Sequence, residues 1–297
     1  MFHTGIQLLA LCRQEGTSIS TSMIRQEARL FAADETAVRE RMHHRWTIMK
    51  DGIRQAIEEE RSSMGGLIGG ECRKVLARVE TGRSICSSVT ARAMAYAMGL
   101  LEVNASMGIV VAAPTGGSCG ILPGTLRALQ EHHGFTDDQM VDALFHAAAI
   151  GTLIVHNATV SGAEGGCQAE TGSAAAMTAS AICELMQAAP TVSLHAAAMA
   201  LKNVMGQVCD PVAGLVESPC QKRNALGAAN ALISAEMALS GITSVIPFDE
   251  VVTAMGAVGK NLPASLRETA KGGIAVTPTA CQIQQRLAGK QPPQPST

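Results

Sequence analysis

Aromatic side chains are almost absent from this sequence, at 2% of 297 residues with one tryptophan and one tyrosine. Hydrophobic residues nevertheless make up 47%, so a core must be filled mainly by Ala, Val, Leu, Ile and Met. Such a core favours helices packed on helices over a sheet sandwich, which draws on aromatic and β-branched residues. Strand-type alternation with hairpin turns is also missing. We therefore expect an all-α fold.

The sequence also lacks a charge excess. Its formal net charge is −2, and it has no basic stripe and few aromatics on which bases could stack, so we expect no nucleic-acid partner. The longest apolar run, residues 143–155, contains His146 and is too short to span a bilayer. The N-terminus shows neither the basic region nor the cleavage site of a secretory signal. These absences predict a cytoplasmic protein with no membrane partner.

Compact metal and phosphate motifs are missing as well. The sequence contains no CxxC pair, no HExxH and no GxxxxGK[ST]. Its nine cysteines are expected to be mostly reduced thiols if the protein is cytoplasmic. Any metal site must therefore use ligands that are dispersed along the chain.

Glycine and proline divide the chain into helical stretches. The first expected helix has Ser20 or Thr21 as its N-cap, and a long charged amphipathic stretch follows. The expected helices after the first lie at residues 34–61, 86–107, 136–158, 171–188, 191–206 and 224–241.

Charge density falls after two glycine pairs near residue 68, and the chain becomes rich in Ala, Met and Gly. We therefore predict an N-terminal helical arm over residues 1–68, loosely separated from the rest. Residues 69–290 would form an all-helical catalytic domain, and residues 291–297 a disordered tail.

Three irregular loops, each containing glycine and proline or several glycines, lie between apolar helices. Their sequences are AAPTGGSCGILPG at 112–124, NATVSGAEGGCQAETGS at 157–173 and CDPVAGLVESPCQKRNA at 209–225. Binding groups are commonly found on loops that a rigid scaffold holds. We therefore look for the functional residues in these three loops.

Three cysteines in the second and third loops, Cys167, Cys209 and Cys220, are candidate metal ligands. Cys167 and Cys220 lie near expected helix N-termini, where the helix dipole favours a thiolate. Three thiolates without a fourth would leave one coordination site open, as a Lewis-acid catalyst requires. The residues alone also allow the simpler interpretation of small buried hydrophobes, since free cysteines are often buried. That interpretation is preferred for Cys12, Cys72, Cys86, Cys183 and Cys281, and Cys119 stays ambiguous.

Taken together, four segments resemble the α chain of iron–sulfur-dependent bacterial L-serine dehydratase. They are NATVSGAEGGCQAETGSA, CDPVAGLVESPCQKRNA, APTGGSCGILPG and LRETAKGGIAVTPT, and the likeness extends through STSMIRQE over nearly the whole chain. The resemblance implies a multi-helix catalytic domain whose loops surround a 4Fe–4S cluster. It implies that Cys167, Cys209 and Cys220 hold this cluster and leave one iron free for substrate. Gly165 and Gly166 would let the backbone pass close to it.

The resemblance implies the reaction of an L-serine ammonia-lyase. Water is eliminated from the β-position of L-serine with Lewis-acid assistance, and the product hydrolyses to pyruvate and ammonia. No lysine lies in a recognisable pyridoxal phosphate motif, so a Schiff-base mechanism is not expected. Two alternatives stay open. The first is the same chemistry on threonine or cysteine, and the second is a non-catalytic metal-binding or regulatory role.

Several polar residues are candidates for substrate binding. Thr115, Gly117 and Ser118 could donate to the substrate carboxylate, although they could instead form the N-cap turn of the next helix. Asn157 and Ser161 are similar candidates. Arg223 could neutralise the substrate carboxylate or the charge of the cluster, and a surface or capping role is an alternative.

The base that removes the Cα proton is left open. Glu164, Glu170 and His156 lie near Cys167 in the sequence, and a partner chain could also supply the base.

Two departures from the family pattern carry expectations. Some single-chain members end in a cysteine that caps the free iron, whereas this sequence ends in Ser296 and Thr297, so we expect no such capping. Two-chain members work with a separate β chain, and no part of this sequence resembles it. We therefore expect a hetero-oligomer with a serine dehydratase β chain.

Overall fold

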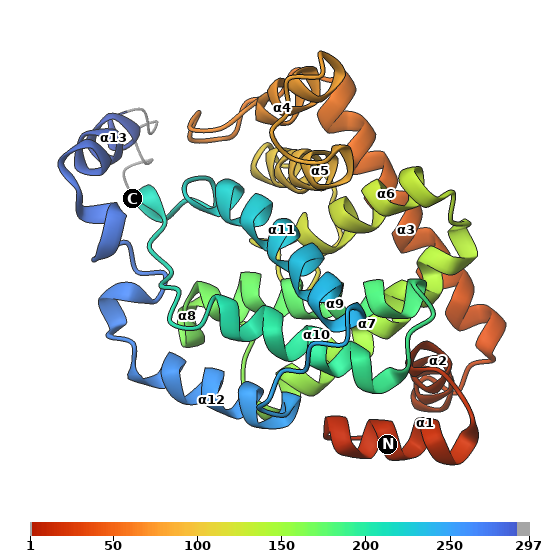
Figure 1. Ribbon diagram of the computed structural model, residues 1–297. Coiled ribbons are helices and arrows are strands. Elements are labelled where there is room, and N and C mark those ends of the chain that lie inside the picture. Colours follow the sequence, from red (N-terminus) through yellow and green to blue (C-terminus); the bar gives the residue numbers. More distant parts are fainter. Residues whose placement is uncertain (1, 290–297) are drawn as a thin grey trace.

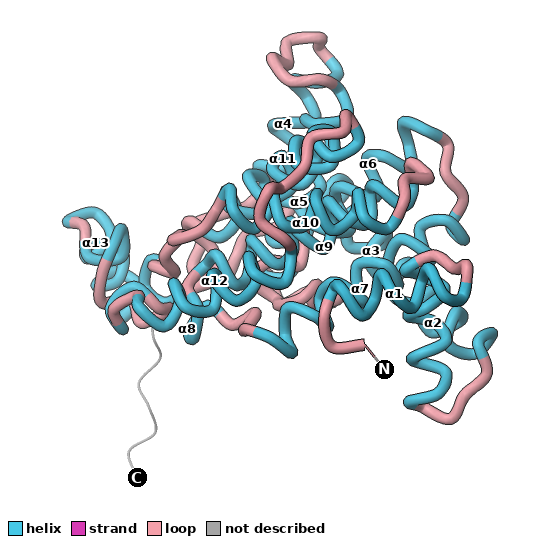
Figure 2. The backbone as a smooth tube through the Cα atoms, turned by 60° about the horizontal axis from the view of Figure 1, so that its bottom comes forward, coloured by secondary structure: helices cyan, strands magenta, loops and turns pink. Residues whose placement is uncertain are grey.

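The computed structural model describes residues 2–289. Over these residues the chain folds into thirteen α-helices, with short 3₁₀ and π turns and no strand beyond a single bridge between Cys209 and Arg267. Figure 2 shows helices joined by loops throughout. The expected all-α fold is confirmed, while the predicted tail over 291–297 lies outside the described residues.

The helices follow one another along the chain with these bounds: α1 Gly5–Glu15, α2 Ile19–Leu30, α3 Glu35–Glu58, α4 Glu71–Glu80, α5 Ser88–Ala105, α6 Ile121–His133, α7 Asp137–Asn157, α8 Gly162–Gly165, α9 Ser173–Leu185, α10 Pro190–Asn203, α11 Cys220–Leu239, α12 Phe248–Asn261 and α13 Pro278–Ala288.

Every helix predicted between breakers is present, and two boundaries needed correction. The N-cap of α2 is Ser18, whose hydroxyl accepts from the Thr21 N–H at 3.1 Å, so neither Ser20 nor Thr21 is the cap. The helix predicted to begin at 224 is α11, which begins at Cys220. Gln, Lys and Arg are good helix formers, so the chain turns helical directly after Pro219. Cys220 is therefore the first residue of a 20-residue helix.

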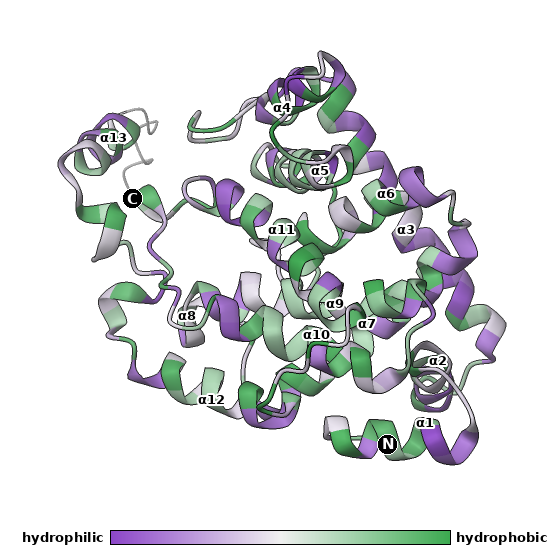
Figure 3. Cartoon of the chain, viewed as in Figure 1, coloured by the Kyte–Doolittle hydropathy of each residue, from purple (hydrophilic) through white to green (hydrophobic). Residues whose placement is uncertain are grey.

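Helix α9 lies at the centre of the fold and packs against α6, α7, α10 and α11 (Figure 1). All of its residues except Glu184 are buried, and most of them are Ala or Ser. Small side chains let neighbouring helices approach closely, which is how a core without aromatics fills its volume. Figure 3 shows hydrophobic residues on the central helices and hydrophilic ones on α3 and α4.

The closest helix approach joins α5 and α6. A Cβ on Gly120 would lie 2.0 Å from the Ala97 carbonyl oxygen, and one on Gly124 would lie 2.5 Å from the Ala97 nitrogen. Only glycine fits at these two positions. They bring the loop that precedes α6 against α5 and so fix the position of the TGGSCG segment.

The N-terminal helices share the main core. Helix α2 packs on α7, and α3 packs on α5 and α7. Trp46 of α3 is fully buried, and its indole N–H donates to Asp137 at 2.9 Å. Helix α7, where the apolar run was noted, is the one described helix long and apolar enough to cross a membrane, and 67% of its apolar window is buried in the protein. The division at residue 68 stays a prediction.

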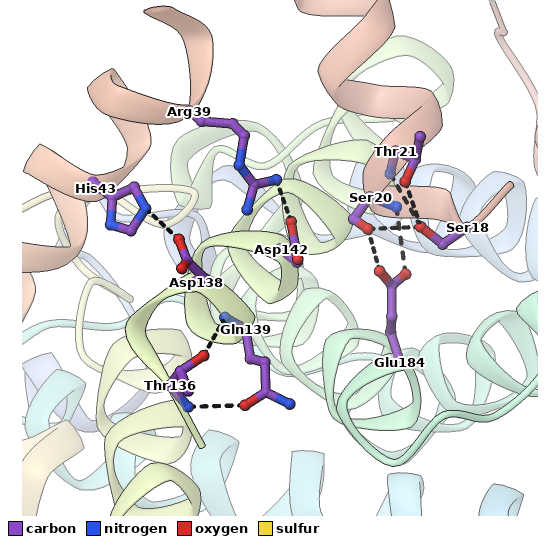
Figure 4. A network of polar contacts seen from close by, with 10 residues as sticks. All are labelled: Ser18, Ser20, Thr21, Arg39, His43, Thr136, Asp138, Gln139, Asp142 and Glu184. Atoms are coloured by element: carbon purple, nitrogen blue, oxygen red, sulfur yellow. Dashed lines mark hydrogen bonds and ion pairs between the residues drawn. The ribbon is translucent and has the colours of Figure 1, made fainter. Parts of the chain in front are cut away.

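A buried polar cluster ties α2 to α7 and α9. The Ser20 hydroxyl and N–H donate to the Glu184 carboxylate, as Figure 4 shows, and the His146 ring contacts the same carboxylate. Burial raises the pKa of Glu184, but the hydrogen bonds from His146 and Ser20 outweigh it, so the net effect is a pKa below the usual value. A carboxyl with a lowered folded-state pKa stabilises the fold above its unfolded pKa, and this contribution is lost as the pH falls through the folded value.

Replacing Glu184 with Gln should therefore destabilise the protein in a pH-dependent way. The variant loses the charge that its donors stabilise, and we expect a loss of ~1–3 kcal/mol at pH 7. The difference from the wild type should shrink below about pH 4, because the unfolded chain then takes up a proton at Glu184 while the lowered folded-state pKa resists it. Urea unfolding from pH 7 down to about pH 2 measures it, with Glu58→Gln on the exposed face of α3 as control. A difference that stays constant over this range would contradict the assignment.

Candidate functional site

Three buried thiols lie in one neighbourhood. Cys167 directly precedes the π turn Gln168–Gly172, Cys209 lies in the loop after α10, and Cys220 begins α11. Burial raises the pKa of Cys220 to about 12, and the next contributions come from Cys167 and Glu170. Burial likewise raises the pKa of Cys209, with Cys167 and Cys220 among the further causes. The predicted ligands are therefore electrostatic neighbours, although they are far apart in the sequence.

These thiols are not gathered around a single ion. Across residues 2–289, no three Cys, His, Asp or Glu side chains are arranged to hold one metal ion. A polynuclear cluster is larger than one ion, so its thiolate ligands stand further apart. The three thiols are therefore neighbours that stand too far apart to bind one ion together.

The glycines before Cys167 serve the chain's own packing. Gly166 has a φ of 76°, and a Cβ there would also lie 2.8 Å from the Gln207 carbonyl oxygen. A Cβ on Gly165 would lie 2.8 Å from the Ala169 methyl group. We expected this pair to make room for a cluster, but protein atoms already fill the space beside both. The glycine that faces one of the three candidate thiols is Gly162, where a Cβ would lie 3.1 Å from the Cys209 Sγ.

The late LRETAKGGIAVTPT segment holds Cys209. The Cys209 N–H donates to the Leu266 carbonyl at 2.9 Å, and the Glu268 N–H donates to the Cys209 carbonyl at 2.7 Å. The next residue, Asp210, accepts from the Ile274 N–H at 2.8 Å. The segment between α12 and α13 thus lies beside Cys209, on the side of the fold that also carries α8 (Figure 1).

Arg223 links the segments that carry the three cysteines. It lies one helical turn after Cys220, and its guanidinium donates to the Val208 carbonyl and to Asp210 Oδ1, both at 2.8 Å. Burial raises the pKa of the Cys167 thiol, and the charge of Arg223 lowers it in part. The Arg223 side chain is 16% exposed and that of Asp210 is 3% exposed, so the two residues form a buried ion pair. The surface role considered for Arg223 is therefore wrong.

The TGGSCG loop is held from two helices. Asn224 of α11 donates to the Gly117 carbonyl at 2.8 Å and accepts from the Gly120 N–H at 3.1 Å. Asn104 of α5 donates to the Gly116 carbonyl at 3.1 Å. No side chain caps α6, so a side-chain N-cap role for Thr115 or Ser118 is not observed.

Inside this loop, two hydroxyls form a chain that ends on Glu170. The Thr115 hydroxyl donates to Glu170 Oε1 at 2.8 Å and lies 3.0 Å from the Ser118 hydroxyl. A hydroxyl has one proton to donate, so Ser118 is the donor to Thr115. Burial raises the pKa of the Glu170 carboxyl, and the hydrogen bond from Thr115 lowers it in part. Gly117 adjoins the same carboxylate, because a Cβ there would lie 3.2 Å from both of its oxygens.

The other candidates are placed differently. Ser161 is the N-cap of α8, where its carbonyl accepts from the Gly165 N–H at 2.8 Å. Asn157 is exposed at the end of α7, and its amide donates to the His3 and Leu153 carbonyls, both at 2.8 Å. These bonds turn it toward the N-terminus, so the structure does not bring Asn157 to the thiols.

Of the residues named as possible bases, only Glu170 lies beside the thiols, and it is half-buried. Glu164 is exposed and accepts from the Thr159 hydroxyl at 2.5 Å. His156 is also exposed, and its ring centre lies 4.5 Å from that of His3. Glu170 is the carboxylate that lies among the three cysteines.

Two buried residues that position the site were missed in the sequence. Asn224 follows Cys220 by four residues, which places both on one face of α11. Glu217 is 2% exposed and accepts from the Ser63 hydroxyl at 2.6 Å and from the Gly65 N–H at 2.7 Å. The PCxxxN spacing of residues 219–224 is a signal that could have indicated Asn224. The partner of Glu217 lies 154 residues away, so no local pattern indicates the second.

Fold and site together define an all-helical protein in which two regions, residues 157–173 and 209–225, hold three buried thiols next to a carboxylate. The family described as "Serine dehydratase alpha chain" matches residues 14–275. The chain belongs to the serine dehydratase alpha chain family.

Curated relatives align over almost the whole chain. "Probable L-serine dehydratase, alpha chain" from Bacillus subtilis is 44% identical over 289 residues, which cover 97% of this chain and 96% of that protein. "L-serine dehydratase, alpha chain" from Peptoniphilus asaccharolyticus is 40% identical over 95% of this chain and 97% of that protein. The longer "L-serine dehydratase" from Streptomyces coelicolor is 37% identical over 94% of this chain and 62% of that protein.

Proposed function

We propose that this chain is the α subunit of an L-serine dehydratase, an L-serine ammonia-lyase that converts L-serine to pyruvate and ammonia. The observation that carries the proposal is the placement of Cys167, Cys209 and Cys220 around Glu170, which two distant segments bring together. The names of the relatives from Bacillus subtilis and Peptoniphilus asaccharolyticus support the same reaction.

A 4Fe–4S cluster fits the residues present. Three thiols and no histidine make up the proposed donor set, which is the ligand type that iron–sulfur clusters use. Gly162 places no side chain against the Cys209 thiol, since a Cβ there would lie 3.1 Å from its Sγ. The guanidinium of Arg223 lies next to Cys167 and offsets negative charge. Cys167, Cys209 and Cys220 would hold the cluster.

When bound, the cluster would supply a Lewis-acidic iron that makes the β-hydroxyl of serine a better leaving group. The chain itself would bind and orient the substrate. In the described part of the chain, the N–H groups of Gly117 and Ser118 donate to no protein acceptor. Two adjacent free N–H groups form a binding site for an anion, so we assign them to the substrate carboxylate. Thr115 and Ser118 would keep this loop in register with Glu170.

The α-chain names also support a second subunit, and we assign the β chain that the sequence resemblance implies as its partner. The base that removes the Cα proton stays open between this chain and that partner. A cytoplasmic location stays a prediction.

Anaerobic reconstitution with iron and sulfide tests the proposed function. The reconstituted chain should contain both, and with the β chain it should form pyruvate from L-serine. Without the β chain we expect at most a few per cent of that rate. Exposure to air or to an iron chelator should remove the activity, because an iron with an open coordination position is easily lost. Zinc without sulfide in the purified protein, or no pyruvate in the presence of the β chain, would contradict the proposal.

A further inference from the structure

Glu170 is half-buried and has fewer hydrogen-bond partners than the carboxylates of Asp210, Glu217, Glu184 and Glu102. Asp210 accepts from Arg223 and from a backbone N–H, Glu217 accepts from three donors, and Glu184 contacts Ser20 and His146. Glu102 accepts from the Cys72 N–H and from Gln221. Glu170, in contrast, accepts one hydrogen bond among residues 2–289, from the Thr115 hydroxyl to Oε1.

No cation of the described chain is paired with Glu170. The nearby guanidinium of Arg223 is engaged by Asp210 and by the Val208 carbonyl. The neighbouring charge that acts on the Glu170 carboxyl is another acid, Glu268, which raises its pKa further. An ionised carboxylate away from water is costly unless a cation and hydrogen bonds compensate it. A ligand that brings a cation to this carboxylate would therefore be bound favourably.

The second oxygen of Glu170 is directed toward the thiols. A Cβ on Gly162 would lie 3.0 Å from Glu170 Oε2 and 3.1 Å from Cys209 Sγ, so the carboxylate oxygen and the thiol border the same space. In the part of the chain that the structure describes, Oε2 accepts no hydrogen bond. Both glycines that line the carboxylate, Gly117 and Gly162, leave it uncovered by side chains.

The surroundings of Glu170 match the charges of an α-amino acid. Gly117 lies against the carboxylate and carries one of the free N–H groups assigned above to the substrate carboxylate. In an α-amino acid, the ammonium and carboxylate groups are bonded to the same carbon. A site for such a molecule therefore needs an anion and N–H donors a few ångströms apart, which is the arrangement of Glu170 and Gly117.

We propose that Glu170 binds the α-ammonium group of the amino-acid substrate, and that Thr115 is a positioning residue that orients its carboxylate. This assignment rests on the proposed function, because it identifies how that site selects 2-amino acids over the corresponding compounds without an amino group. Glu170 then contributes to substrate affinity, and another group removes the Cα proton.

Glu170→Gln in the cluster-loaded αβ enzyme tests the proposal. We expect iron and sulfide contents equal to those of the wild type and a KM for L-serine about 10- to 100-fold higher, as when a charge-assisted hydrogen bond is lost. The kcat should change much less. Glu236→Gln, on the exposed face of α11, is the matched control and should leave KM unchanged.

Two inhibitors separate an ammonium-binding role from other roles. The inhibition constant of L-alanine, which has the amino group, should rise in Glu170→Gln by about the same factor as the KM. That of 3-hydroxypropanoate, which lacks the amino group, should stay the same. Equal weakening of both inhibitors would overturn the proposal in favour of a structural role. A kcat that collapses at constant KM would overturn it in favour of proton transfer.

Thr115 gives a second measurement. Thr115→Val removes the hydroxyl donor and should raise the KM for L-serine, whereas Thr115→Ser keeps the donor and should restore it. Failure of Thr115→Ser to restore KM would contradict the positioning role. The two proposals can fail separately. If the wild-type αβ enzyme binds L-alanine in calorimetry but forms no pyruvate from L-serine, the proposed function is wrong. Calorimetry with L-alanine then still compares ammonium binding between the wild type and Glu170→Gln.

Discussion

Serine at position 167, 209 or 220 is expected to remove the iron–sulfur cluster and the activity with it. Each of the three buried cysteines is a proposed ligand, and a serine hydroxyl is a much poorer iron ligand than a thiolate. Loss of one outer-sphere partner already costs about 10- to 100-fold in metal affinity or activity, so loss of a direct ligand should exceed that. Iron and sulfide analysis, visible absorbance and the pyruvate assay measure the effect.

Two other cysteines provide the controls. Cys119 is 1% exposed and lies in the TGGSCG loop, so Cys119→Ala tests a buried thiol in the same region. Cys281 is exposed on α13, so Cys281→Ser tests a surface thiol. Both variants should keep a full cluster. A full cluster in any variant of the three proposed ligands, or an equal loss in Cys119→Ala, would show that the ligand set is wrong.

The fold was predictable because its signals are local. A composition with almost no aromatics, and glycine or proline at the ends of the apolar stretches, were enough to place seven of the helices to within a few residues, whereas others such as α1, α4 and α12 were not predicted. The start of α11 was missed because Pro219 was taken as part of a loop that continued to residue 224. A proline is equally compatible with the residue just before a helix, and the helix-forming residues after it decide the boundary.

The site was predictable only in part, because its remaining parts depend on long-range contacts. The motifs named the cysteines, Thr115 and Arg223. The partners that give these residues their surroundings are distant: Glu170 meets Thr115 across 55 residues, and Asn224 meets the Gly117 carbonyl across 107. Asn157 is an example of the reverse. It is close to Cys167 in the sequence, but its side chain is turned toward the N-terminus at the end of α7.

Arg223 is expected to have the second large effect, on both cluster binding and stability. Arg223→Ala leaves Asp210 as a buried charge without a cation, which costs about 3–5 kcal/mol. It also removes the positive charge next to Cys167, so we expect most of the cluster to be lost. Arg223→Lys keeps a charge but not the planar group that donates to both Val208 and Asp210, so its effects should be intermediate. Urea unfolding and iron analysis measure the two effects separately.

A double variant separates the two roles of Arg223. Combining Arg223→Ala with Asp210→Asn removes the unpaired buried charge, so much of the lost stability should return. The cluster should not return, because the positive charge next to Cys167 is still missing. Recovery of both properties would mean that Arg223 acts only by compensating Asp210. Recovery of stability alone identifies the guanidinium as a group that offsets the charge of the thiolates, which is why the fold places one buried arginine where the three cysteine segments meet.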